Sequence, residues 1–128
     1  MEYLFLLGRI LYGGFFLMSG LNHFTQSAAM TGYAQSKGVP APKLAVLGTG
    51  LLLLLGGASV LLGVAPRVGV LLLVVFLVPT TLVMHAYWKV QDAQWRQVDQ
   101  INFMKNLALL GAALSLLFVP EPWPLSLG

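Results

Sequence analysis

Four long apolar stretches constrain what this chain of 128 residues can fold into. They cover residues 3–21, 44–64, 68–88 and 101–119. A helix of roughly 20 apolar residues matches the hydrocarbon core of a bilayer, which is about 30 Å thick. Helices are favoured there because each unpaired backbone amide in lipid costs several kcal/mol. The sequence therefore predicts an all-α integral membrane protein, a single transmembrane domain built as a four-helix bundle.

The composition agrees with a lipid environment. Only 9% of the residues are charged and 58% are hydrophobic, whereas a soluble domain carries about 25% charged residues. The chain has no cysteine, which excludes disulfides, thiolate metal sites and dithiol redox chemistry carried by this chain alone. The net charge of +3 is not gathered in a basic run. Nucleic acid is therefore not an expected partner, and anionic lipid headgroups are the plainer interpretation.

The connections between the apolar stretches differ in character. Only Ala65-Pro66-Arg67 separates the second from the third, so these two helices are expected to pack as antiparallel neighbours. The middle of the first connection, residues 27–37, is expected to form a short interfacial helix that Gly38 ends. The third connection, residues 89–100, contains Trp95 as a membrane-interface anchor. Small residues that let helices approach closely are expected at packing seams: Gly13, Gly14, Ser19, Gly20, Gly48, Gly50, Gly56, Gly57 and the segment 111–113.

Basic residues are more frequent on the side of the first and third connections. The positive-inside rule then favours cytoplasmic connections and external termini. The residues on that side are Lys37, Lys43, Lys89, Arg96 and Lys105, against Arg9 and Arg67 on the other.

Polar residues gather where the first and third helices end and the fourth begins. Within each helix they recur at spacings of three and four, which places them on one helical face. The sequence predicts a ligand-binding cluster of Ser19, Asn22, His23, His85, Trp88, Asn102, Lys105 and Asn106, with Thr81 on the same face as His85 and Trp88. The alternative is structural, because helix ends meet water and polar side chains join neighbouring helices for about 1 kcal/mol or less. No metal site and no catalytic residue follow from this pattern.

Arg9 is a charge inside the first apolar stretch, on the opposite side from the polar cluster. No Asp or Glu lies within any predicted span, so an internal ion pair is not expected. The side chain either reaches back to the terminal face or points inward toward a carbonyl, a lipid phosphate, a bound ligand or another subunit. The sequence leaves both alternatives open.

Several segments of the chain resemble the DoxX family. They are Gly8-Arg9-Ile10, the run from Phe16 to Phe24, Tyr33-Ala34, the run from Ser36 to Pro42, His85-Ala86-Tyr87-Trp88 and the run from Gln100 to Gly111. The resemblance implies a four-helix protein of the bacterial inner membrane, from a family named after a subunit assigned to a terminal quinol oxidase or sulfur-oxidising system. It also implies roles for Arg9 and for the polar motif of Asn102, Lys105 and Asn106. The chain departs from the family at Leu53, where a Glu is often found, and so lacks an obvious intramembrane proton carrier.

Two hypotheses for function follow. The first is a membrane subunit of a redox or respiratory process that binds a quinone or similar lipid-soluble carrier at the polar cluster, with His85 exchanging a proton near neutral pH. Its electrons must come from a partner protein. The second is a non-enzymatic scaffold, assembly factor or lipid-binding module, acting with a protein partner or as a homo-oligomer. Transport is a weaker third, because the polar residues stay at one end instead of crossing the bilayer.

Overall fold

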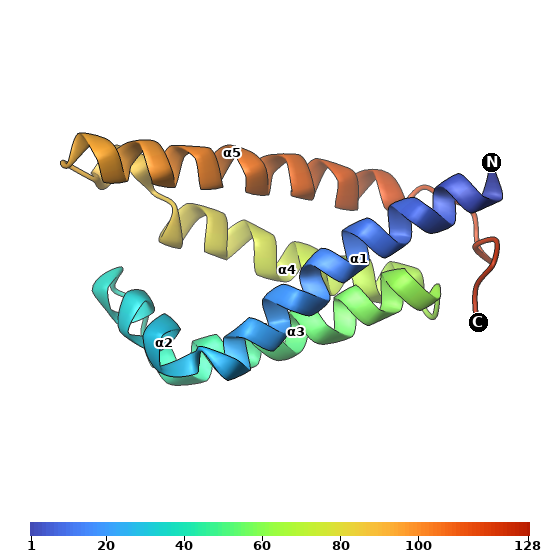
Figure 1. Ribbon diagram of the computed structural model, residues 1–128, viewed down its shortest axis with the longest axis horizontal. Helices are drawn as coiled ribbons and strands as arrows, with labels where there is room; N and C mark the ends of the chain where they lie inside the picture. The colour runs from blue at the N-terminus through green and yellow to red at the C-terminus, as the bar shows by residue number, and fades with distance from the viewer.

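The computed structural model describes all residues from 1 to 128 and is entirely helical. Its elements are α1 (Glu2–Thr25), α2 (Ser27–Ser36), α3 (Pro42–Leu62), α4 (Pro66–Met84), a 3₁₀ turn η1 (Tyr87–Lys89) and α5 (Ala93–Leu116). Figure 1 shows α1, α3, α4 and α5 running along the long dimension of the molecule, with the short α2 at one end and both termini at the other. The first and third connections, at α2 and η1, lie at the same end of the molecule, as the sequence predicted, and the α3–α4 turn lies with the termini.

Three segments are long and apolar enough to cross a membrane. They are Glu2–Thr25, Pro42–Leu62 and Pro66–Lys89. Helix α5 is not among them, because polar residues interrupt it at Asp99, Asn102, Lys105 and Asn106. The structure thus confirms an all-α protein with several helices long and apolar enough to cross a membrane. A simple bundle of four equivalent spans is not what it shows, since α2 is a fifth helix and α5 is less apolar than the other long helices.

Two helix boundaries differ from those expected from the sequence. Helix α5 begins at Ala93 and not near residue 101, because one carboxylate oxygen of Asp92 accepts hydrogen bonds from the backbone N–H groups of Gln94 (2.9 Å) and Trp95 (3.2 Å). Such a cap satisfies amides that the first turn leaves unpaired. Helix α4 ends at Met84, and His85 leaves the helical region with φ −119° and ψ 35°. The expectation that Trp88 continues one helical face with Thr81 and His85 is therefore wrong.

Glycines set the distance between α1 and α3. A Cβ atom added to Gly13 would lie 2.7 Å from the Gly57 carbonyl oxygen, and one added to Gly20 would lie 2.9 Å from the Gly50 carbonyl oxygen. Real Cβ atoms do not approach that closely, so the two antiparallel helices meet backbone to backbone. Gly56 is also closely packed, since a Cβ atom there would lie 2.7 Å from the Cδ2 atom of Leu73 on α4. The remaining expected glycines meet no neighbour within 4 Å: Gly14, Gly48 and Gly111.

The apolar core lies between α1, α3 and α4 and reaches the C-terminal segment. Phe16, Leu53, Leu73 and Leu77 are its largest aliphatic and aromatic members from the helices, and Trp123 joins them from the tail. Leu53 is completely buried. The position at which the resemblance led us to expect a Glu is therefore a core position in this chain.

Arg9 points inward at the end of the molecule that holds both termini. Its side chain is 2% exposed and donates hydrogen bonds to the carbonyl oxygens of Val60 (3.2 Å), Leu61 (2.9 Å), Pro124 (2.6 Å) and Leu125 (3.3 Å). Of the partners that the sequence left open for an inward-pointing Arg9, the structure shows backbone carbonyls. The guanidinium carbon also lies 5.7 Å and 5.8 Å from the ring centres of Phe5 and Trp123.

Candidate functional site

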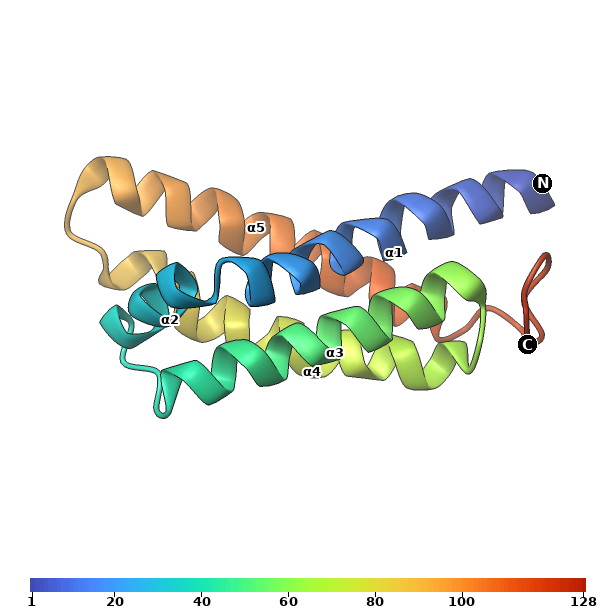
Figure 2. The ribbon, with the colours of Figure 1, turned by 60° about the horizontal axis from the view of Figure 1, so that its bottom comes forward.

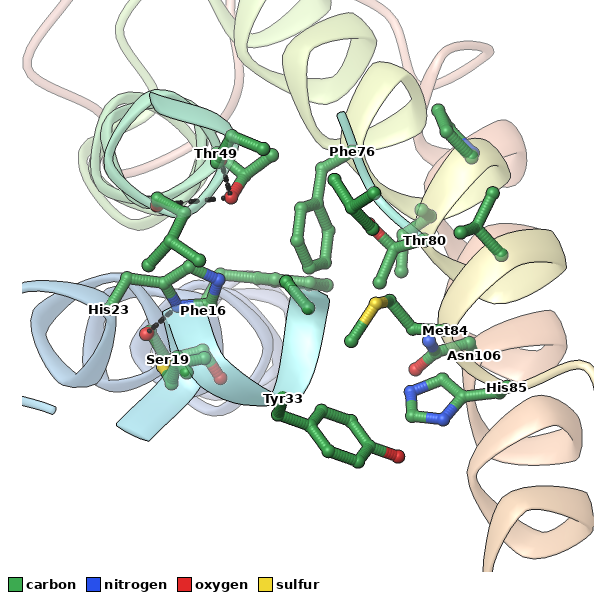
Figure 3. A pocket seen from close by; sticks show the side chains of 18 of the residues that line it. Phe16, Ser19, His23, Tyr33, Thr49, Phe76, Thr80, Met84, His85 and Asn106 are labelled. Carbon is green, nitrogen blue, oxygen red and sulfur yellow. Dashed lines mark hydrogen bonds between the residues drawn. The ribbon is translucent and has the colours of Figure 1, made fainter. Parts of the chain in front are cut away.

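A cavity of about 670 Å³ opens at the end of the molecule that carries α2. Its size is within the range of roughly 300–1,000 Å³ typical of small-molecule sites. All five α-helices contribute to its wall, and most of the lining is apolar (Figure 3). The polar members of the lining are Ser19, His23, Tyr33, Thr49, Thr80, His85, Lys105 and Asn106.

His23, on α1, presents a hydrogen-bond acceptor at one side of the cavity. Its Nδ1 lies 2.7 Å from the backbone carbonyl oxygen of Ser19, one helical turn earlier. Because a carbonyl can only accept, Nδ1 must carry the proton, and in the neutral ring Nε2 is then an acceptor. The ring also packs edge-to-face against Phe76, with 6.0 Å between ring centres. The orientation of this imidazole is therefore held from two sides.

Asn106, on α5, lies across the cavity from His23, beside Met84 and His85 (Figure 3). It is 6% exposed, lines the cavity and makes no hydrogen bond to another group of the protein. Its amide atoms are not among the fully buried unpaired polar atoms of the chain, so they reach the open space of the cavity. The amide offers both donors and an acceptor, so it can bind either a carbonyl or a hydroxyl group placed in the cavity.

Asp99 is the centre of a polar network beside the cavity. It is 4% exposed, and its Oδ2 lies 2.8 Å from Lys37 Nζ. Its Oδ1 accepts a hydrogen bond from the Tyr33 hydroxyl at 3.4 Å and lies 3.5 Å from His85 Nδ1. Tyr33 and His85 line the cavity. One carboxylate thus connects α5 to the C-terminal end of α2 and to the residue that follows α4.

The network is charged near neutral pH. Burial raises the pKa of Asp99, but hydrogen bonds from Lys37 and His85 and the charge of Lys37 outweigh it and hold the pKa below its usual range. The hydrogen bond to Asp99 raises the pKa of Lys37 despite the opposing effect of burial. Burial and the neighbouring carboxylate raise the pKa of Tyr33, so its hydroxyl remains a donor. Lys37 and Asp99 therefore form an ion pair over a wide pH range.

Two contacts join α1 to α5 at the side of the cavity, although the two helices do not pack closely against each other. The Tyr12 hydroxyl donates a hydrogen bond to the Leu109 carbonyl oxygen at 2.5 Å. Nearer the polar end, Lys105 Nζ lies 5.5 Å from the ring centre of Phe15, and both side chains are exposed. Lys105 is therefore at the rim of the cavity and Asn106 is inside it.

Five of the eight residues expected to bind a ligand line this cavity, and three do not. Ser19, His23, His85, Lys105 and Asn106 lie in its wall. Asn22 is exposed, Asn102 is half-buried away from the cavity, and Trp88 packs edge-to-face on Phe103 with 5.6 Å between ring centres. Asn22 directly precedes the lining residue His23, and Asn102 lies one helical turn before the lining residue Asn106. The cavity therefore contacts only a small part of each helix.

The sequence reasoning missed Asp99, Lys37 and Tyr33. Asp99 was assigned to a connection because α5 was expected to start after it. The sequence did contain an indication of the earlier helix start, since Asp92 is a suitable helix cap. Asp99 then precedes Asn106 by seven residues, or about two helical turns. Lys37 and Tyr33 carried no such signal, because their position depends on how α2 folds back over the bundle.

The model of the DoxX family matches residues 4–86. The chain belongs to the DoxX family. In this DoxX protein the matched residues contain α1 to α4 and the cavity residues His23 and His85, whereas α5 with Asp99 and Asn106 lies beyond them. No curated protein matches the chain. No solved structure matches it either.

Proposed function

We propose that this DoxX protein binds a quinone or a similar lipid-soluble carrier in the cavity, as a membrane subunit of a redox process in the bacterial inner membrane. The observation that carries the proposal is Asn106. The residue is largely buried, and its amide has no partner in the protein and reaches a largely apolar cavity. Such a cavity with a few convergent polar groups is the usual form of a small-molecule site.

The distribution of polarity in the cavity suits a ring with oxygen substituents. Asn106 can donate a hydrogen bond to a ligand carbonyl, and His23 Nε2 can accept one from a hydroxyl on the opposite side. Phe15, Phe16 and Leu109 provide apolar surface for an attached hydrocarbon chain on the side where α1 and α5 diverge. A carrier dissolved in the membrane is therefore the class of ligand that matches both parts of the cavity.

Electron transfer requires a partner protein in this proposal. Reducing a quinone to its quinol takes two electrons and two protons, and the chain has no cysteine and no recognised redox motif to supply the electrons. A redox protein bound at the membrane is the expected donor or acceptor of electrons. His85 is suited to exchange a proton with the ligand, because it lines the cavity and contacts Asp99, whose other partner Lys37 is at the surface.

Native mass spectrometry of the protein extracted gently from its own membrane tests the proposal. The wild type is compared with Asn106→Leu, which keeps the branched shape of the side chain but removes the amide. Asn102→Leu is the matched control, since it changes the same residue type on the same helix outside the cavity. We expect a quinone or other redox-active lipid on the wild type and on Asn102→Leu, and its loss from Asn106→Leu.

Two results would contradict the proposal. One is the absence of any redox-active lipid from the wild type. The other is a quinone retained equally by both variants. Phospholipid or a co-purifying protein on all three would instead favour the alternative, in which the chain is a scaffold or lipid-binding module.

A further inference from the structure

Helix α2 covers the cavity at the end of the molecule opposite the termini. The members of α2 that line the cavity are Ala29, Met30, Tyr33 and Ala34. The chain leaves the helical conformation on both sides of α2, at Gln26 with φ −113° and ψ 30° and at Gly38 with φ +80°. Figures 1 and 2 show α2 set at an angle to α1, as a short segment attached at its two ends.

The two long sides of α2 are held very differently. Toward the rest of the bundle, α2 packs on α3. Toward α5 there is no comparable packing of helix on helix, and the bonds to Asp99 make the connection. These are the ion pair from Lys37 at 2.8 Å and the hydrogen bond from Tyr33 at 3.4 Å.

The same carboxylate also contacts the wall of the cavity. Asp99 Oδ1, which accepts from Tyr33, lies 3.5 Å from His85 Nδ1. A change in the hydrogen bonding of His85 therefore acts directly on Asp99, the carboxylate that binds Lys37 and Tyr33. One side chain, that of Asp99, thus contacts both α2 and the wall of the cavity.

We propose that α2 is a lid over the cavity, and that Asp99 is the latch that holds it closed by binding Lys37 and Tyr33. Releasing the latch swings α2 away from α5 about Gln26 and Gly38 and opens the polar end of the cavity. The Lys37 side chain is 21% exposed, and ion pairs with such exposure are weak. The closed lid therefore opens readily. We expect opening on roughly the microsecond-to-millisecond time scale that is typical of lids.

The absence of cysteine from the chain makes the lid measurable. Gln35→Cys on α2 and Gln97→Cys on α5 change two exposed residues, and spin labels on both report the distance across the latch by electron paramagnetic resonance in lipid nanodiscs. We expect one short distance in the otherwise wild-type chain. In Asp99→Asn we expect the ratio of open to closed lid to rise by about fivefold, the effect of losing one weak ion pair.

Lys37→Met removes the other half of the latch and leaves the buried carboxylate region of α5 intact, so it keeps the test valid if Asp99→Asn does not fold. Lys43→Met is the matched control, because Lys43 is exposed at the start of α3 and makes no bond to α5. We expect Lys37→Met to behave like Asp99→Asn, the double variant to add nothing, and Lys43→Met to resemble the wild type. Unchanged distances in both Asp99→Asn and Lys37→Met would overturn the proposal.

The identity of the ligand rests on the proposed function, whereas the distance measurement needs no ligand. If the distance changes in the variants but the wild type carries no bound carrier, the lid proposal is supported and the quinone proposal is contradicted. A bound carrier with unchanged distances would do the reverse.

Discussion

Arg9 Nη1 donates a 2.6 Å hydrogen bond to the carbonyl oxygen of Pro124, 115 residues later in the chain. The same guanidinium binds the Val60 and Leu61 carbonyls at the end of α3. The C-terminal end of a helix carries partial negative charge and unpaired carbonyls. The buried guanidinium of Arg9 is thus hydrogen-bonded to backbone oxygens instead of a carboxylate, and it joins the first helix, the third helix and the tail.

This arrangement predicts that Arg9→Lys is strongly destabilising although the charge is kept. An ammonium cannot reproduce the planar fork that reaches α3 and the tail at once. Hydrogen bonds from charged donors contribute about 1.5–3 kcal/mol each, so we expect a loss of roughly 2–4 kcal/mol. Thermal unfolding in detergent measures it, with Arg67→Lys, an exposed residue, as the control. Equal melting temperatures for the two variants would show that the four carbonyl contacts contribute nothing.

The glycine seam between α1 and α3 predicts opposite outcomes for two neighbouring substitutions. Gly13→Ala places a methyl group 2.7 Å from the Gly57 carbonyl oxygen and forces the helices apart, at a cost of roughly 1–3 kcal/mol. Gly14→Ala meets nothing within 4 Å and is expected to stabilise by up to about 1 kcal/mol through helix propensity. Unfolding by denaturing detergent compares them. The packing seam is misplaced if Gly14→Ala proves the more damaging change.

The bond between Tyr12 and Leu109 predicts that Tyr12→Phe loosens the contact of α1 with α5. The change removes only the hydroxyl that donates across the two helices at 2.5 Å. We expect a loss of about 1 kcal/mol, the usual net value of one hydrogen bond. Hydrogen–deuterium exchange should also become faster in the second half of α5. Tyr3→Phe, on an exposed residue of the same helix, should leave both measurements unchanged.

The ion pair between Lys37 and Asp99 predicts a stability profile with two limits. The pKa of Asp99 is lowered from its ordinary value of 3.8, so its contribution is present above that value and is lost as the pH falls through the lower pKa of the folded protein. The pKa of Lys37 is raised from 10.5, so its contribution is complete below 10.5 and is lost as the pH rises through the higher pKa of the folded protein.

The difference in melting temperature between the wild type and Asp99→Asn should therefore be constant between about pH 5 and pH 9 and shrink at both extremes. The corresponding difference in the free energy of unfolding should be modest, about 1 kcal/mol, because Lys37 is partly exposed. A difference that changes steadily across the neutral range would mean that another group, such as His85, dominates the network.

The sequence by itself determined that this protein lies in a lipid environment, and it determined most of the helices. Long apolar stretches leave the chain no other way to pair its backbone, and helices α1, α3 and α4 follow from that requirement alone. The short helix α2 was also readable, because Gly38 and the prolines after it end a polar helical segment. The polar ends of the helices were enough to bring His23, His85 and Asn106 into one region.

Only the tertiary structure decided which polar residues face the cavity and which partners they have. A helix turns by about 100° per residue, so neighbouring residues differ sharply in exposure, as do His23 in the cavity wall and the exposed Asn22. Asp99 became the centre of the network because α5 starts at Ala93 and carries it to the end of α2. Arg9 found carbonyls because the tail folds back over α3. These contacts join residues far apart in the chain, and their geometry depends on packing that no local pattern encodes.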